Sequence, residues 1–96
     1  MKKIRRINII DIEGTCWPDG ITPDGKKQRN VAEIIEIGIC QIDVRELKIL
    51  DKQSYLVKPI LYSTLSEYCT ELTGITNEML EKEGTTLKYA IERMMS

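Results

Sequence analysis

The chain has 96 residues, of which 42% are hydrophobic and 30% are charged, and its formal net charge at pH 7 is −1. This length and composition predict one small soluble globular domain or a piece of a larger one. The net charge creates no overall positive electrostatic field that would attract a polyanion. The longest apolar runs are too short to span a membrane, and the start MKKIRR is not typical of a signal peptide. A cytoplasmic location is therefore expected.

The chain contains no histidine, and its three cysteines, Cys16, Cys40 and Cys69, are widely spaced. An odd number of cysteines without histidine predicts neither a disulfide framework nor a zinc site, so we expect buried or half-buried thiols. Histidine is the usual side chain for proton transfer near neutral pH. This chain alone is therefore not expected to use a Ser-His or Cys-His nucleophile.

The first half of the chain predicts two strands separated by a long loop. Residues 4–12, IRRINIIDI, have the isoleucine content of a strand. Residues 16–30 contain the turn sequence Pro-Asp-Gly twice, which indicates an exposed loop. Residues 33–44 carry isoleucine on both faces of an extended segment, and this pattern predicts a strand that is largely buried on both sides.

A third strand is expected directly after a short turn at residues 45–48. It covers residues 49–59, ILDKQSYLVKP, and stops at Pro59 because proline cannot donate a hydrogen bond to a sheet. Short connections between consecutive strands favour antiparallel pairing. The three strands are therefore expected to form an antiparallel meander.

Three helices are expected after the strands, because three hydroxyl residues stand where each could cap a first helical turn. The expected helices are residues 67–73 after Ser66, residues 77–83 after Thr76, and the segment after Thr86. Gly74 and Gly84 are expected to end the first two helices. The third carries one apolar stripe, formed by Leu87, Ala90, Ile91, Met94 and Met95. The chain stops directly after this stripe, so the fold is expected to be incomplete.

Asp11 and Glu13 form an acidic pair between an apolar strand and a Gly-Thr turn. Side chains two residues apart in a strand point to the same face, so the two negative charges repel each other. One interpretation is a pair of solvated residues on a polar face. The other is a metal site, since Mg²⁺ and Mn²⁺ prefer carboxylate oxygens and no basic partner is evident. The apolar residues that lead into the pair favour the metal site.

Four sequence blocks occur in the order DIEGTCW, EIIEIG, LVKP and LSEYCTELTGIT. Together they resemble the front half of the DEDDh 3′-to-5′ exonucleases of the DnaQ-like fold, and within that family the Eri-type and KapD-like RNA exonucleases. The resemblance covers residues 7–95. It implies an α/β, ribonuclease-H-like fold, which is α+β over this length, with a three-stranded antiparallel meander followed by short helices. Residues 1–96 would then be the N-terminal part of a single exonuclease domain.

The resemblance also implies a chemistry and a set of site residues. Asp11 and Glu13 would hold two Mg²⁺ or Mn²⁺ ions, of which one activates a water and the other stabilises the leaving 3′ oxygen. The expected partner is the 3′ end of RNA or single-stranded DNA, with RNA preferred because the nearest branch contains RNA exonucleases. The expected substrate-binding residues are Gly14, Thr15, Trp17, Leu72, Thr73, Gly74 and Ile75.

Three features around this pair allow two interpretations each. Trp17 either stacks on a base or anchors the loop. The basic run of Lys26, Lys27 and Arg29 either contacts a nucleic acid backbone or is a solvated loop. Glu36 either supports the site from the neighbouring strand or has no part in it, and it is not expected to be a metal ligand.

The family completes its site with an Asp from a second motif and with a His and an Asp from a third, and these 96 residues contain neither motif. We therefore expect weak metal binding and no efficient hydrolysis by this chain alone. The interpretation that we favour is the N-terminal half of a working exonuclease, because both carboxylates and the LTGIT segment are present. The alternatives are a non-catalytic remnant that binds single-stranded nucleic acid, and an interaction module. The first strand would have an open edge, which predicts self-association.

Overall fold

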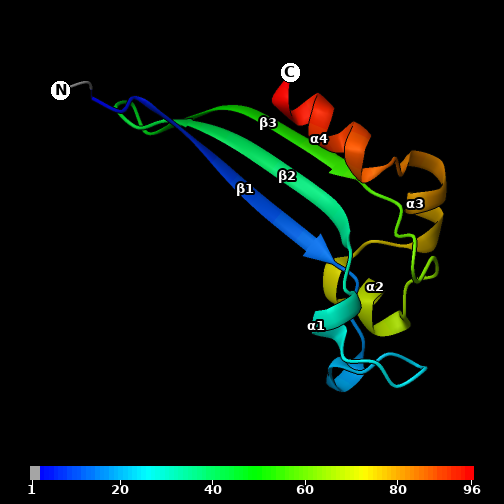
Figure 1. The fold of residues 1–96 in the computed structure, drawn as a ribbon. Helices are drawn as coiled ribbons and strands as arrows, with labels where there is room; N and C mark the ends of the chain where they lie inside the picture. Colours follow the sequence, from blue (N-terminus) through cyan, green and yellow to red (C-terminus); the bar gives the residue numbers. More distant parts are fainter. Residues whose placement is uncertain (1–2) are drawn as a thin grey trace.

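The structure, a computed structural model, describes residues 3–96. Three strands form one sheet in the order β1-β2-β3, and each strand runs antiparallel to its neighbour, which confirms the predicted meander. The strands are β1 (Arg6–Gly14), β2 (Ile34–Asp43) and β3 (Lys48–Leu56). The helices are η1 (Pro18–Gly20), α1 (Gln28–Val31), α2 (Glu67–Thr73), α3 (Asn77–Glu83) and α4 (Leu87–Met95) (Figure 1).

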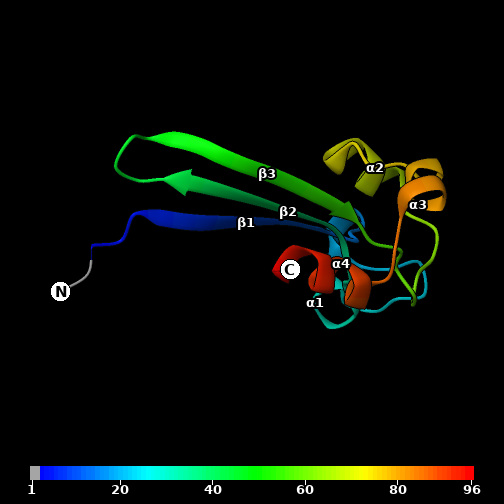
Figure 2. The ribbon, with the colours of Figure 1, turned by 90° about the horizontal axis from the view of Figure 1, so that it is seen from above.

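The molecule is elongated, with extents of 52 × 27 × 22 Å. Figure 1 shows the β2–β3 turn and the start of β1 at one end, while α1, α2 and α3 gather at the other end, where β1 finishes. In Figure 2 only α4 lies along the sheet, and the helices α2 and α3 lie beyond its end. Within residues 3–96 no helix has the length and apolar character needed to cross a membrane.

Two groups of buried side chains attach the helices to the sheet. The larger group contains Cys16, Ile35, Leu65, Cys69, Ile75 and Leu80, and the smaller contains Ile37, Val57 and Ala90. By contrast, all residues in the ranges 3–12 and 44–54 are exposed. Apolar burial is the main stabilising contribution to a small domain, so the free energy of folding is concentrated at the end of the sheet that carries the helices.

The helix caps follow the prediction. The side chains of Ser66, Thr76 and Thr86 each accept a hydrogen bond from the backbone N–H three residues further along the chain. Gly74 ends α2 with φ 79°, a left-handed conformation that glycine adopts without a steric penalty. Gly84 ends α3 with an ordinary φ of −68°. All three predicted helices are therefore present with their predicted starts.

The prediction that the second strand is buried on both sides was wrong. Ile35 and Ile37 are buried, but Ile34, Cys40 and Ile42 are only half-buried. Among the described residues, α4 is the only helix that lies along the sheet, so most of β2 has no covering layer. The apolar composition of the strand correctly indicated a central position between β1 and β3, but not the burial of both faces.

The loop after the first strand is less exposed than predicted. Cys16, Trp17 and Thr22 are buried within it, and the short helices η1 and α1 form there. The Trp17 ring lies edge-on against Tyr62, with 5.0 Å between the ring centroids. Trp17 and Tyr62 are far apart in the sequence, so the residues of the loop alone do not indicate that they are in contact.

At the end of the sheet that carries no helices, the side chain of Asp43 connects the β2–β3 turn to Arg5. Its carboxylate accepts hydrogen bonds from the backbone N–H groups of Arg45 and Glu46 and lies 3.3 Å from Nε of Arg5. These backbone bonds, followed by the Arg5 guanidinium, hold the pKa of Asp43 below its usual value despite its burial. Arg5, directly before β1, is thereby attached to the β2–β3 turn.

Candidate active site

Asp11 and Glu13 lie near the end of β1 and, being two residues apart, point to the same face of the sheet. On the neighbouring strand β2, Gly38 stands opposite Asp11 and Glu36 stands opposite Glu13. Asp11 is exposed and Glu13 is half-buried. The register therefore brings Glu36 to the acidic pair, as the sequence allowed, and places a residue without a side chain beside Asp11.

The electrostatics of this face are unbalanced. The ion pairs within residues 3–96 are Arg5–Asp43, Lys26–Asp24 and Lys48–Glu46, and none of them involves the acidic pair. Glu36 accepts a hydrogen bond from Oγ of Ser54 at 3.1 Å. Like charges directly opposite each other on neighbouring strands are destabilising. Water or a cation must therefore offset the repulsion between Glu13 and Glu36.

The donor atoms of this face suit a hard divalent cation only in part. Carboxylate oxygens are the ligands that Mg²⁺ and Mn²⁺ prefer, and both ions keep several water ligands. Within the described part of the chain, however, no group of three or more His, Cys, Asp or Glu side chains is arranged to hold a metal ion. Asp11 and Glu13 can thus supply two ligand groups, and the remaining ligands would come from water or from other groups.

The segment after Glu13, residues 14–17, is fixed by hydrogen bonds to Glu33. The backbone N–H of Thr15 donates to the carbonyl oxygen of Glu33 at 2.8 Å, and Oγ1 of Thr15 accepts from the N–H of Glu33 at 2.9 Å. A Cβ atom on Gly14 would lie 3.3 Å from the same carbonyl oxygen, so little room is left for a side chain. The predicted Gly-Thr turn was wrong, because Gly14 is the last residue of β1 and residues 15–17 form no turn. Thr15 is buried and holds this segment against Glu33.

Helix α2 is attached to the same segment by two contacts. Oγ of Ser66 donates to the carbonyl oxygen of Cys16 at 2.7 Å, and Sγ of Cys69 lies 3.6 Å from the carbonyl oxygen of Gly14. The end of α2 carries Leu72, whose side chain is 67% exposed although it is large and apolar. The structure thus joins the DIEGTCW and LTGIT segments, which are more than 50 residues apart in the chain.

The predicted substrate-binding residues divide by accessibility. Leu72 and Gly74 are exposed, Gly14 and Thr73 are half-buried, and Thr15 and Ile75 are buried. Thr73 donates a hydrogen bond to the carbonyl oxygen of Cys69 and accepts one from the N–H of Ile75, which fixes the chain after α2. The accessible members could therefore contact a ligand, while the buried members have structural roles.

Trp17 belongs to the buried framework. Its side chain is 5% exposed, and its ring lies against Tyr62. The backbone N–H of Trp17 also donates to Oε1 of Gln28 at 3.0 Å. This arrangement supports the interpretation of Trp17 as a loop anchor and does not support base stacking, because a base needs an open ring face.

The Cys16 thiol is not a nucleophile in this arrangement. Burial, followed by a hydrogen bond with Cys69, raises its pKa to about 11, so the thiol is protonated at neutral pH. Thiolate is the reactive form of cysteine. The carboxylates of Asp11 and Glu13 therefore remain the candidate groups for the chemistry of this site.

A family model described as Exonuclease matches residues 9–95 of this chain. The chain belongs to this exonuclease family. Among curated relatives, the 3′-5′ exoribonuclease 1 of Rattus norvegicus is 36% identical over 93 residues, which are 94% of this chain and 25% of the relative. The ERI1 exoribonuclease 2 of Xenopus laevis is 34% identical over 88 residues, which are 92% of this chain and 12% of the relative. The chain thus spans only 12% to 25% of the length of these exonucleases.

Solved exonuclease structures match the same fold. A 3′-exonuclease in specific recognition of the 3′ end of a histone mRNA stem-loop has a TM-score of 0.81 and 30% identity, over 98% of this chain and 39% of that one. The nuclease domain of 3′hExo, a DEDDh family member bound to rAMP, matches with a TM-score of 0.78 and 28% identity. This match covers 95% of this chain and 42% of that one. These matches confirm the resemblance to DEDDh exonucleases and the predicted ribonuclease-H-like architecture.

Proposed function

We propose that this chain supplies the first two metal-binding carboxylates, Asp11 and Glu13, of a 3′-to-5′ exonuclease that acts on the 3′ end of RNA. The observation that carries the proposal is the position of both side chains on one face of β1, without an ion pair among residues 3–96. RNA is favoured over DNA because the relatives named above are exoribonucleases.

Each part of this surface has a role in the proposal. Asp11 and Glu13 bind Mg²⁺ or Mn²⁺ through their oxygens, and the bound ions supply water activation and stabilisation of the leaving 3′ oxygen. The missing side chain at Gly14 leaves room for the terminal nucleotide, and the exposed Leu72 packs against its base. The 96 residues contain no histidine that could act as general base, so hydrolysis by this chain alone is slow.

The proposal is tested first by metal binding. We expect Mn²⁺ to broaden the NMR signals of residues around Asp11 and Glu13, with a dissociation constant on the order of 10⁻³ M, because two carboxylates supply few of the ligands. Asp11→Asn combined with Glu13→Gln should abolish this local broadening. Asp19→Asn is the matched control, since Asp19 is an exposed carboxylate in η1, and it should leave the broadening unchanged.

The same proteins then report on hydrolysis. With single-stranded RNA labelled at its 5′ end and Mn²⁺, shortening from the 3′ end should be slow and should disappear in the double variant. Broadening that persists in the double variant, or shortening that continues in it, would place the metal site elsewhere and contradict the proposal.

We also propose that the chain associates with itself through β1. Within residues 3–96, β1 is an edge strand of the sheet, and Ile7, Ile9, Ile10 and Ile12 are between 46% and 52% exposed. An exposed apolar edge is a template for pairing with another strand. A second copy of the chain provides the same edge, so a symmetric pair of β1 strands can form, while the exposed apolar residues of α4 allow an exchange of helices instead.

Substitution at this edge should change the oligomeric state. We expect dimers or larger assemblies in light scattering at tens of micromolar, and Ile9→Lys should shift them to monomers because it places a charge in the paired edge. Ile60→Lys is the matched control, because Ile60 is 85% exposed but lies outside the sheet. A monomeric wild-type chain whose amides at residues 7–11 exchange rapidly would show that the edge is not used.

A further inference from the structure

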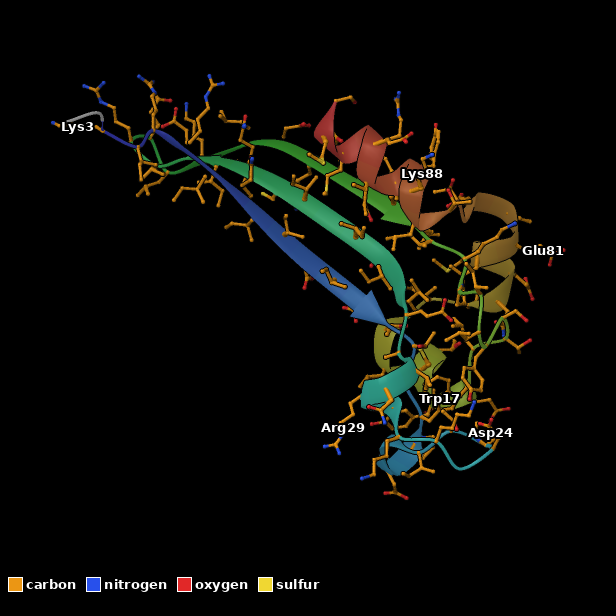
Figure 3. The ribbon with its side chains drawn as sticks, in the orientation of Figure 1. Lys3, Trp17, Asp24, Arg29, Glu81 and Lys88 are labelled. Atoms are coloured by element: carbon orange, nitrogen blue, oxygen red, sulfur yellow. The ribbon has the colours of Figure 1, made fainter. Side chains whose placement is uncertain are left out.

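The connection between β1 and β2 carries three basic side chains that differ in their surroundings. Nζ of Lys26 lies 3.8 Å from Oδ2 of Asp24. Lys27 and Arg29 are exposed and take part in no ion pair within residues 3–96. Figure 3 shows Arg29 on the outer side of α1, with Asp24 on the opposite side of the connection. Two of the three positive charges are therefore available to a ligand.

The backbone that carries these two charges is attached to the chain segment that follows the acidic pair. Gln28, which stands between them, accepts the hydrogen bond from the backbone N–H of Trp17. Trp17 follows Glu13 by four residues, so the two Cα atoms are at most about 14 Å apart. The connection that carries Lys27 and Arg29 is thus attached directly to the segment that follows the proposed metal site.

The charges of the neighbouring elements indicate where a polyanion could bind. The helices α2 and α3 together contain five Glu residues and one Lys residue, so they repel phosphate groups. On the other side, Lys27, Gln28 and Arg29 line a hollow of about 400 Å³ together with Asp19, Gly20 and Ile21. This hollow has two positively charged side chains and one negatively charged side chain, so its net charge favours an anion. The guanidinium of arginine can donate two parallel hydrogen bonds to a phosphate.

We propose that Lys27 and Arg29 bind backbone phosphates of the nucleic acid strand several nucleotides before its 3′ end. The proposal rests on the proposed function for the position of the 3′ end at Asp11 and Glu13. Each nucleotide of a stacked strand advances about 3.4 Å along the strand axis, so the separation of at most about 14 Å between Glu13 and Trp17 spans up to roughly four nucleotides. The contact therefore serves oligonucleotides and is out of reach for a mononucleotide.

Salt-dependent binding tests this contact. The wild-type chain should bind a fluorescent 12-nucleotide single-stranded RNA in metal-free buffer, with an affinity that falls as salt rises. Lys27→Gln combined with Arg29→Gln should reduce the slope of log K against log salt concentration by about 1.4, since each phosphate contact on a single strand contributes about 0.7. Lys26→Gln is the matched control, and its slope should stay at the wild-type value because Lys26 is paired with Asp24.

The outcomes separate this proposal from the proposed function. An unchanged slope in the Lys27 and Arg29 variant, or a wild-type chain that does not bind the RNA even at low salt, overturns the phosphate contact, whatever the Mn²⁺ experiment shows. A reduced slope supports the contact even if Mn²⁺ binding fails, and in that case only the metal site is lost. The binding of adenosine monophosphate should be the same in the variant and the wild type. Weaker binding of adenosine monophosphate by the variant would indicate a general disturbance of the site and would also overturn the proposal.

Discussion

Ile35→Ala is expected to lower the free energy of unfolding by about 2–5 kcal/mol, the range for removing a fully buried isoleucine side chain. Ile35 has no exposed surface and lies in the larger buried group with Cys69 and Leu80. It therefore joins β2 to the helices α2 and α3. A domain of this size has a total stability of about 5–15 kcal/mol, so this one substitution removes a large fraction of it.

Urea denaturation followed by circular dichroism measures this loss, and it should be made at a concentration where the wild-type oligomeric state is known. Ile60→Ala is the control because Ile60 is 85% exposed, and a change within about 0.5 kcal/mol is expected for such a surface position. If both variants lose the same free energy, the end of the sheet that carries the helices does not hold the stability assigned to it.

Gly84→Ala is expected to cost about 1–3 kcal/mol by steric crowding. The φ of Gly84 is −68°, which alanine adopts freely, so the effect does not come from backbone strain. A Cβ atom at this position would lie 2.7 Å from Cγ of Lys58 and would collide with the carbonyl oxygen of Leu80. That oxygen accepts the hydrogen bond from the N–H of Gly84, so it cannot move away without breaking the end of α3.

Thermal unfolding should show a decrease of several degrees for Gly84→Ala, since 1 kcal/mol corresponds to about 4–8 °C in a domain of this length. Gly38→Ala is the control, because its Cβ atom would meet only the carbonyl oxygen of Asp11 at 3.8 Å, an ordinary contact. It should be neutral or slightly stabilising. Equal melting temperatures for the two variants would mean that Gly84 is not crowded.

The elements that could be predicted from the sequence are those with local signals. Ser66, Thr76 and Thr86 each stand directly before the helix that they cap, and the hydrogen bond reaches only three residues along the chain. The pairing of β1 with β2, which brings Glu36 opposite Glu13, could also be expected, since strands that follow each other in the chain are usually neighbours in a sheet. The cytoplasmic location stays a prediction.

The parts that could not be predicted depend on contacts between distant residues. Tyr62 buries Trp17, although 45 residues separate them. The carboxylate of Glu33 accepts hydrogen bonds from the N–H groups of Ile60 and Leu61, and nothing in the apolar run around Glu33 indicates this role. Burial of β2 depends on which layers cover the sheet, and its isoleucine content alone cannot specify them.

The unequal burial along the sheet also affects how β1 fluctuates. Local opening costs least where few apolar contacts are buried, and residues 3–12 are all exposed. Beyond Glu13, by contrast, the two hydrogen bonds between Thr15 and Glu33 hold the chain. Although Arg5 is held by Asp43 at the end of the sheet that carries no helices, residues 6–11 should therefore open more readily than Glu13, so that one carboxylate belongs to the fluctuating part and the other to the fixed part. A cation held by both would bind the closed form preferentially, and its affinity would include the free energy of closing the strand.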